Sequence, residues 1–293
     1  MNIQNSYEEN QKGTLYIVPT PIGNLEDITY RAVRILSEVD LIAAEDTRHT
    51  KKLLHYFEIE KETISYHEHN RSERIPYLLR KLDEGKDIAL VSDAGMPAIS
   101  DPGYELVQAT IKKDLSVIVL PGANAAITAL VGSGLPTEQF LFIGFLPRRK
   151  KEQKELLERL QRKKATLILY ESPHRVAQTL HRIAQFFGKR RVALARELTK
   201  VYEQYIRGTV EEVKDWVENN PVRGECVLVI EGNAEAELKV GHWWEELSIV
   251  EHVAHYEKET GLPHKEAMRK VAQDRKLSRR DVYEAIHVKK DEY

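Results

Sequence analysis

Short runs of Val, Ile and Leu alternate with amphipathic segments through the first half of the chain, and this alternation limits the fold more than any other feature. The strand-like runs are 14–18, 41–44, 62–67, 88–92 and 116–120, and the helix-like segments are 29–39, 47–57, 72–85, 102–113 and 123–134. Because the runs are continuously apolar, the predicted strands are covered on both faces. With helices between them, they predict an α/β fold with a mostly parallel sheet.

The pattern changes after Gly134-Leu135-Pro136. Strand-like runs follow at 140–147, 166–172, 191–197, 203–209 and 224–232, with predicted helices mainly at 150–163, 174–187 and 210–218. Several of these strands are close enough in sequence for antiparallel pairing. We therefore expect a flexible start (1–12), a first α/β domain (13–121), a second α/β domain (122–235) and, beyond the polar hinge 232–241, a small helical domain (243–293) with the rhythm of a helix-turn-helix.

Charge and cysteine content exclude some classes of protein. The net charge is −2, with 44 basic and 46 acidic residues, so no global field attracts nucleic acid. Basic residues gather locally at 148–164, 189–200 and 264–280, which fits either solvated helix faces or a surface that contacts a polyanion. No apolar run reaches the length of a membrane span, and the polar start lacks signal-peptide features. With Cys226 as the only cysteine, in an apolar run, a cytoplasmic protein without disulfides is expected.

The segment VSDAGMPAISDPG (91–103) places two turn motifs in one connection between a strand and a helix. Turn-forming residues are ordinary in such loops, so a plain connection remains one interpretation. However, one turn suffices to leave a strand. Two turns stiffened by proline, with glycines that remove side chains, would form a rigid shelf of bare backbone groups suited to holding a ligand. Ligands in open α/β sheets bind at this end of the strands.

Other motifs are weaker. PTPIGN (19–24) matches neither the dinucleotide nor the phosphate-loop fingerprint. His67 and His69 lack a third ligand at metal-site spacing, so a hydrogen-bonding pair or an RNA contact is favoured and no metal is expected. No Gly-x-Ser-x-Gly nucleophile motif occurs, and Ser172 in YESPHR is placed to cap a helix.

Nine motifs in order carry a resemblance that covers roughly residues 13–232: GTLYIVPTPIGNLEDIT, IAAEDTRHT, HEHN, VSDAGMPAISDPG, VLPGANAAITAL, FIGFLP, YESPHR, RELTKVYE and RGECVLVIEG. Together they resemble the tetrapyrrole methylase family, and within it the enzymes that methylate ribosomal RNA. The resemblance implies two α/β domains with S-adenosylmethionine in the cleft between them, and a homodimer. It also implies 2′-O-methylation of a cytidine ribose in the decoding region of small-subunit (16S) ribosomal RNA. Tetrapyrrole methylases often carry Ser-Gly-Asp-Pro in the shelf, so the roles of Asp93 and Asp101 stay interchangeable here.

Site residues follow from the same resemblance. It implies cofactor contacts from the first and fourth strand ends, from the segment after PG, and from the second domain: Pro21, Ile22, Ser92, Asp93, Ala94, Met96, Pro97, Asp101, Asn124, Ala125, Tyr170, Cys226, Val227 and Leu228. A ribose hydroxyl is a poor nucleophile, so a base or polarising cation is needed. The catalytic candidates are Glu45, Asp46, Arg48, Glu171 and Glu197, with the Glu-Asp pair favoured.

The expected RNA contacts are cations, imidazoles and one amide. They are His67, His69, Asn70, Arg148, Arg149, Lys163, His174, Arg175, Arg190, Arg191 and Lys200. Two of the catalytic candidates also have plainer interpretations: Asp46 would cap the following helix, and Glu197 would pair with a neighbouring arginine. Two further functions stay open, a small-molecule methylase of the same fold and a non-enzymatic RNA-binding protein.

Overall fold

The computed structural model describes residues 3–5, 11–233, 243–244 and 247–287. Its contacts divide the chain into two compact units, residues 1–233 and 234–293. Most of the start that was expected to be flexible, and most of the polar hinge, lie outside the described residues. Within the described start, the Gln4 side chain exchanges two hydrogen bonds of 2.8 Å with the backbone of Val117.

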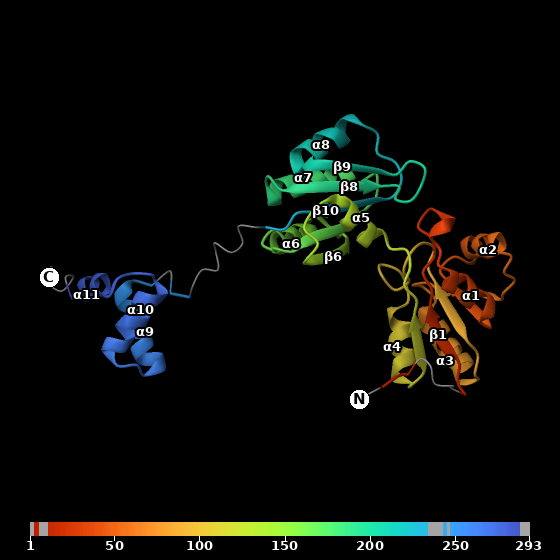
Figure 1. The fold of residues 1–293 in the computed structure, drawn as a ribbon, viewed down its shortest axis with the longest axis horizontal. Coiled ribbons are helices and arrows are strands. Elements are labelled where there is room, and N and C mark those ends of the chain that lie inside the picture. Colours follow the sequence, from red (N-terminus) through yellow and green to blue (C-terminus); the bar gives the residue numbers. More distant parts are fainter. Residues whose placement is uncertain (1–2, 6–10, 234–242, 245–246, 288–293) are drawn as a thin grey trace. The chain divides into compact units, whose positions relative to one another are not determined.

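The first sheet of the larger unit is entirely parallel, with the strand order β3-β2-β4-β1-β5. Its strands are β1 (Thr14–Ile17), β2 (Leu41–Ala44), β3 (Thr63–Ser65), β4 (Ile88–Val91) and β5 (Ser116–Val119). The helices that follow the first four strands are α1 (Tyr30–Glu38), α2 (Thr47–Tyr56), α3 (Arg71–Asp83) and α4 (Tyr104–Lys112), with a short 3-10 turn, η1 (Leu25–Asp27), before α1. Figure 1 shows these helices around the sheet, as the apolar pattern predicts.

Side-chain alternation along the strands explains how both faces are covered. Leu15 and Ile17 of β1 join a cluster with the buried leucines of α3 and α4. Val18, of opposite parity, joins the cluster that contains Leu36 of α1 and Leu54 of α2. Because both faces of the sheet are covered at its centre, β2 and β4 are buried at every position, whereas the edge strands β3 and β5 are only partly buried. The functional groups therefore lie at the strand ends.

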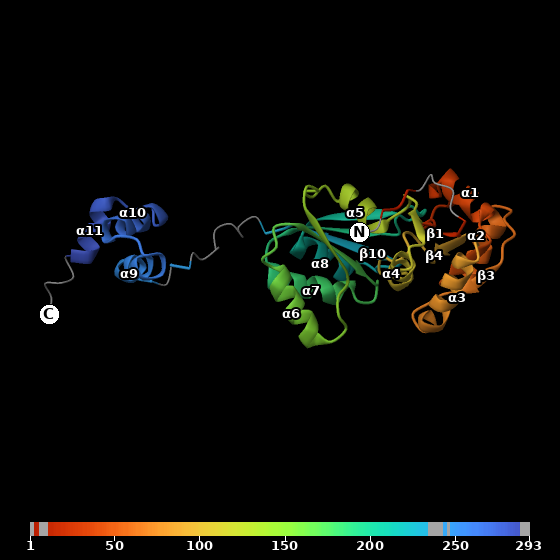
Figure 2. The ribbon, with the colours of Figure 1, turned by 90° about the horizontal axis from the view of Figure 1, so that it is seen from below.

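The second sheet has the order β6-β7-β10-β8-β9, with β6 and β7 parallel and the other neighbours antiparallel. Its strands are β6 (Phe140–Phe145), β7 (Thr166–Glu171), β8 (Arg191–Arg196), β9 (Gln204–Thr209) and β10 (Cys226–Ile230). One face packs against α6 (Lys150–Leu160), α7 (Val176–Phe187) and α8 (Val210–Asn219), and the other against α5 (Ala125–Ser133). Figure 2 shows this sheet with its helices from below. The antiparallel pairing expected from short sequence separations is confirmed for β8 and β9, whereas β10 pairs with the more distant β7 and β8.

The smaller unit is helical in its described part. It contains α9 (Ile249–Thr260), α10 (His264–Asp274) and α11 (Arg279–His287), which share a small core around Val253, Val271 and Val282. Ser278 begins α11 by accepting from the amide of Asp281, whose carboxylate accepts from the Ser278 amide, so each satisfies the other's free donor. Among the described residues, no helix is long and apolar enough to cross a membrane.

Candidate functional site

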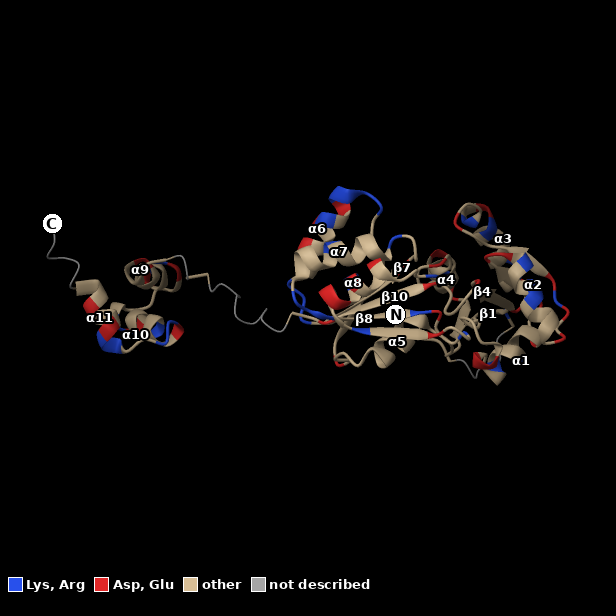
Figure 3. Cartoon of the chain, turned by 90° about the horizontal axis from the view of Figure 1, so that it is seen from above, with Lys and Arg blue, Asp and Glu red and all other residues tan. Residues whose placement is uncertain are grey.

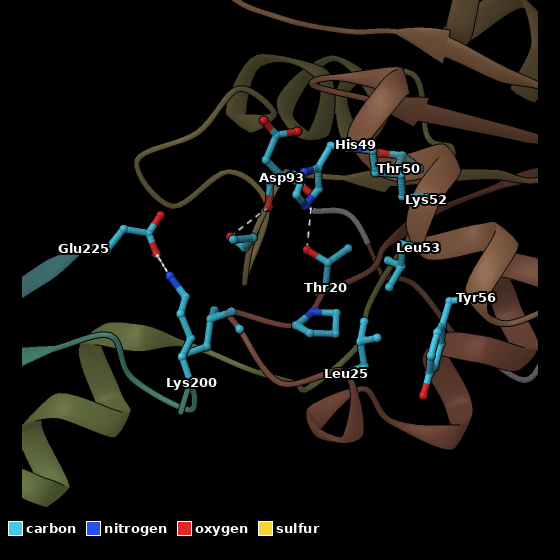
Figure 4. Close-up of a pocket in the computed structure, with 15 residues that line it drawn as sticks. Thr20, Leu25, His49, Thr50, Lys52, Leu53, Tyr56, Asp93, Lys200 and Glu225 are labelled. Carbon is cyan, nitrogen blue, oxygen red and sulfur yellow. Dashed lines mark hydrogen bonds and ion pairs between the residues drawn. The ribbon is translucent and has the colours of Figure 1, made fainter. Parts of the chain in front are cut away.

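A pocket of about 560 Å³ lies at the carboxyl ends of the first sheet's strands. The loop after β1, the segment after β4 and one side of α2 form most of it, and two residues of the second sheet's loops complete it. Figure 4 shows these residues around the cavity. The lining residues are Thr20, Pro21, Ile22, Gly23, Leu25, His49, Thr50, Lys52, Leu53, Tyr56, Ser92, Asp93, Ala94, Lys200 and Glu225.

The double turn after β4 forms a fixed shelf beside this pocket. Gly95 pairs with Thr20 through two backbone hydrogen bonds, of 3.0 and 2.9 Å, which fasten the shelf to the loop after β1. The Thr20 hydroxyl also donates to the Ser92 carbonyl, at 3.1 Å. Ala98 and Ser100 hold positive φ angles of 66°, which side-chain-bearing residues rarely adopt. Strain of this kind persists only where surrounding contacts enforce it, which agrees with a ligand-holding role for the segment.

The loop between β8 and β9 brings the second sheet against the pocket. Lys200 forms ion pairs with Glu197, at 2.9 Å, and with Glu225, at 3.2 Å. Its stem lies where a side chain on Gly23 would be, since a Cβ there would come within 2.4 Å of the Lys200 Cγ atom. The pocket is therefore bounded by both sheets.

Three carboxylates gather at the ends of neighbouring strands. Glu45 follows β2, Asp93 follows β4, and Asp101 lies further along the shelf. Burial raises the pKa of Glu45, and the charge of Asp93 adds to the rise. Burial, with the charges of Glu45 and Asp93, raises the pKa of Asp101 to about 7. A carboxyl group in this state can exchange a proton near neutral pH.

Asp46 and Arg48, by contrast, are occupied with each other. Asp46 caps α2 by accepting from the amide of Arg48, at 2.8 Å, and its carboxylate also pairs with the Arg48 guanidinium, at 2.7 Å. These hydrogen bonds hold the pKa of Asp46 far below that of a free aspartate. At neutral pH Asp46 therefore has little tendency to accept a proton. Its position is that of a helix cap.

Glu171 is buried, with 2% of its surface exposed. Its carboxylate accepts from the Thr179 hydroxyl, at 2.7 Å, and from the amide of Ser172, at 2.9 Å, while the Arg175 guanidinium lies 3.4 Å away. A carboxylate engaged in this way stabilises the junction between β7 and α7. Glu197, the remaining catalytic candidate, is held in its charged form because the hydrogen bond from Lys200 lowers its pKa.

The Thr179→Val substitution tests this buried bond. It removes the hydroxyl and leaves a buried carboxylate oxygen without that donor, so we expect the free energy of unfolding to fall by about 1–3 kcal/mol. Thr128→Val is the matched control, because within the described part of the chain the Thr128 hydroxyl bonds to its own helix, at the Asn124 carbonyl. Urea unfolding followed by circular dichroism measures both. Equal losses in the two variants would contradict the proposed stabilising role.

The predicted cofactor residues fall into two groups. Pro21, Ile22, Ser92, Asp93 and Ala94 line the pocket together. The others lie outside its lining: Met96 packs against the first core, Pro97 is buried, Asn124 caps α5 next to Ala125, and Cys226, Val227 and Leu228 lie in β10. Tyr170 lies near Asp101, whose charge contributes, after burial, to a raised pKa of the phenol. Burial raises the pKa of the Cys226 thiol to about 11, as expected for a packing residue.

The predicted RNA contacts also divide by exposure. The exposed side chains are His69, Arg148, Arg149, Lys163, His174 and Arg191, of which Arg191 pairs with Glu231 and Arg149 with Glu152. Arg190 is instead 8% exposed, donates to the Gln161 and Glu231 carbonyls and lies over the Phe187 ring. The Asn70 side chain bonds to the backbones of His67 and Ser65. Arg190 and Asn70 are therefore engaged in contacts within the protein and do not present a free surface to RNA.

Sequence reasoning missed the pocket wall formed by α2. His49, Lys52, Leu53 and Tyr56 all line the cavity. Their spacing of three to four residues places them on one side of a helix, and that pattern could have identified the wall had the position of the pocket been known.

Comparison with known proteins gives concordant results. Residues 14–214 match the family model described as Tetrapyrrole (Corrin/Porphyrin) Methylases. A protein of Halalkalibacterium halodurans named ribosomal RNA small subunit methyltransferase I is 55% identical over 98% of this chain and 99% of its own length. The protein of that name from Bacillus subtilis is 51% identical over 96% of each chain. Among solved structures, uroporphyrin-III C-methyl transferase from Thermus thermophilus complexed with S-adenosyl homocysteine shares the fold, with a TM-score of 0.53 and 19% identity, covering 75% of this chain and 97% of that one.

Proposed function

Because the chain belongs to the tetrapyrrole methylase family, and within it to the group that contains those ribosomal RNA methyltransferases, we propose that it transfers a methyl group from S-adenosylmethionine to the 2′-oxygen of a cytidine in small-subunit (16S) ribosomal RNA. The observation that supports this most is the pocket, which combines a rigid backbone shelf, carboxylates and basic side chains in one cavity. In a bacterial cell the substrate places the reaction in the cytoplasm.

Methyl transfer depends mainly on the correct positioning of the cofactor and the acceptor oxygen. In an in-line displacement the 2′-oxygen forms a bond to the methyl carbon while the carbon–sulfur bond breaks, and S-adenosylhomocysteine leaves. Pro21, Ile22, Ser92 and Ala94 would hold the cofactor through backbone groups and apolar contact. Asp93 would face its positive charge. Because the fold already holds these backbone groups and this carboxylate in place, they need no reorganisation during the reaction.

The hydroxyl proton needs an acceptor. We propose Asp101 for this role, with Glu45 as its neighbour, because both lie close enough to Asp93 of the pocket lining to feel its charge, and neither forms an ion pair within the described ranges of the chain. Asp46, favoured from sequence, is engaged as a helix cap. The proton passes from the 2′-hydroxyl to the carboxylate and then to water.

A competition of substrates tests the reaction class. Labelled S-adenosylmethionine would be supplied with either small ribosomal subunits from cells that lack this protein, or a reduced uroporphyrin. We expect label on the ribosomal RNA and none on the tetrapyrrole. Label on the tetrapyrrole alone would replace this proposal with a small-molecule methylase. Absence of cofactor binding in calorimetry would favour an RNA-binding protein without activity.

The helical unit provides a second expected RNA contact. Lys265, Arg269, Lys270, Lys276 and Arg279 are exposed on α10 and around the turn to α11, and none pairs with an acidic residue of the described part. Figure 3 shows basic residues on these helices and on α6. Such unpaired cations can replace the counterions of RNA phosphates.

Neutralising four of these residues tests this contact. Replacing Arg269, Lys270, Lys276 and Arg279 with glutamine should weaken subunit binding by at least tenfold at physiological salt and reduce its salt dependence, without changing cofactor affinity. As a control, the same change is made at four lysines that pair with acidic residues, namely Lys12, Lys81, Lys86 and Lys113. Filter binding at several salt concentrations measures both. If both sets of changes had the same small effect, the helical unit would not be the docking element.

We also propose that the protein is a homodimer. Ile127 and Val131 are 44% and 71% exposed on the side of α5 opposite the one buried against the second sheet. Large apolar side chains of this kind, four residues apart on one helix, suit a contact between subunits. Val131→Glu should then yield monomers in light scattering, while an unchanged mass would place the contact elsewhere.

A further inference from the structure

The wall of the pocket formed by α2 has no part in the cofactor contacts proposed above. His49, Lys52, Leu53 and Tyr56 lie along one side of this helix, and Leu25 lines the same cavity from the loop before α1. In Figure 4, Leu53 and Tyr56 lie on the side of the cavity away from Lys200 and Glu225. The pocket therefore has a wall of mixed aromatic, apolar and basic character in addition to its shelf.

Tyr56 is unusual among these residues. Its side chain is 61% exposed, and its ring makes an edge-on contact with the ring of Phe57, with centroids 4.9 Å apart and an angle of 82°. An aromatic ring that lines a cavity while most of its surface faces water can stack on a ligand. Leu53, one turn before it, is partly buried and extends the apolar surface.

Lys52 supplies charge next to this surface. It is exposed, and no acidic side chain in the described ranges pairs with it. Arg48, one turn earlier, is tied to Asp46. An aromatic ring beside an unpaired cation is the combination with which proteins hold single-stranded nucleotides, since the base stacks and the phosphate meets the charge.

We propose that this α2 wall binds an unstacked nucleotide of the RNA substrate, with its base against the Tyr56 ring and a phosphate near Lys52. This inference rests on the proposed function and adds the position of the acceptor strand. The nucleotide would enter the pocket from the α2 side, while the shelf after β4 holds the cofactor. The target ribose would then lie between the two, on the side of Asp93.

Tyr56→Ala and Tyr56→Phe test the stacking contact, with Tyr30→Ala as the control because Tyr30 is 98% exposed on α1 and lies outside the pocket lining. Wild-type protein is measured first, and failure of its methyl transfer to small subunits would reject the proposed function itself. With an active wild type, Tyr56→Ala should raise the KM for subunits roughly tenfold, while Tyr56→Phe stays within about twofold. Cofactor affinity in calorimetry should be unchanged in all three variants.

Two results would overturn the inference while leaving the proposed function intact. If Tyr56→Ala weakens cofactor binding and leaves the KM for subunits unchanged, the wall belongs to the cofactor site. If Tyr56→Ala behaves like Tyr30→Ala in both measurements, the wall binds neither. Lys52→Gln gives an independent readout, since loss of a phosphate contact should raise the KM and lower its dependence on salt.

Discussion

Asp101→Asn should lower the rate of methyl transfer by about 10²–10⁴-fold while leaving cofactor affinity within a small factor of the wild type. The amide keeps the size of the side chain but cannot accept the hydroxyl proton, and general base catalysis contributes this order of magnitude. Single-turnover transfer to small subunits measures the rate, and calorimetry measures the affinity. Asp215→Asn is the control, because Asp215 is an exposed carboxylate on α8.

The pH profile provides a second readout of the same residue. Asp101 has a pKa of about 7, raised by burial and by Glu45 and Asp93, and it acts as a base only when ionised. The rate should therefore be nearly constant above this pH and fall about tenfold per pH unit below it. Glu45→Gln removes one neighbouring negative charge, so the fall should move to lower pH. A profile of Asp101→Asn that keeps the wild-type shape would assign the proton to another group.

Gly95→Ala should weaken cofactor binding by at least tenfold. Gly95 has a φ of +78°, and a Cβ there would come within 3.2 Å of the Ile22 Cγ2 atom and 3.5 Å of the Ala123 carbonyl oxygen. The strain would shift the shelf against the loop after β1, and a change of about 1.4 kcal/mol in binding is a factor of ten. Calorimetric titration with S-adenosylmethionine measures the effect.

Gly134→Ala separates the local effect from general destabilisation. Gly134 has a similar φ of +72°, but nothing lies within 4 Å of a Cβ built there. Both variants should lose about 1–2 kcal/mol of stability from the left-handed backbone conformation. Only Gly95→Ala should also lose cofactor affinity. Equal affinities in the two variants would mean that the shelf after β4 is not part of the cofactor site.

The sequence predicted the elements well because each is specified locally. The run Ile88–Val91 is apolar on both faces and became the central strand β4. The antiparallel pairing of β8 with β9 followed from the short spacing between these strands. Periodicity and turn chemistry reach no further than a few residues, so they did not specify the pairing of β10 with the more distant β7 and β8.

The roles of individual site residues depend on neighbours far away in the chain, and there the sequence was less informative. The turn chemistry of Asp46 was visible, but its engagement by Arg48 and the clustering of Glu45 with Asp101 required the fold. Arg190 appeared in a basic run, yet its guanidinium is committed to the Gln161 and Glu231 carbonyls. A charge run alone does not distinguish a solvent-facing cation from one that ties loops together.

Whether the acceptor is a ribose hydroxyl of small-subunit RNA can be determined by transferring labelled methyl to subunits from cells that lack this protein, hydrolysing the RNA in alkali and locating the label. A 2′-O-methyl group prevents alkaline cleavage of the adjoining bond, so we expect label in a single alkali-resistant dinucleotide with cytidine at its 5′ position. Label released in mononucleotides would place the methyl group on a base and rule out transfer to a ribose.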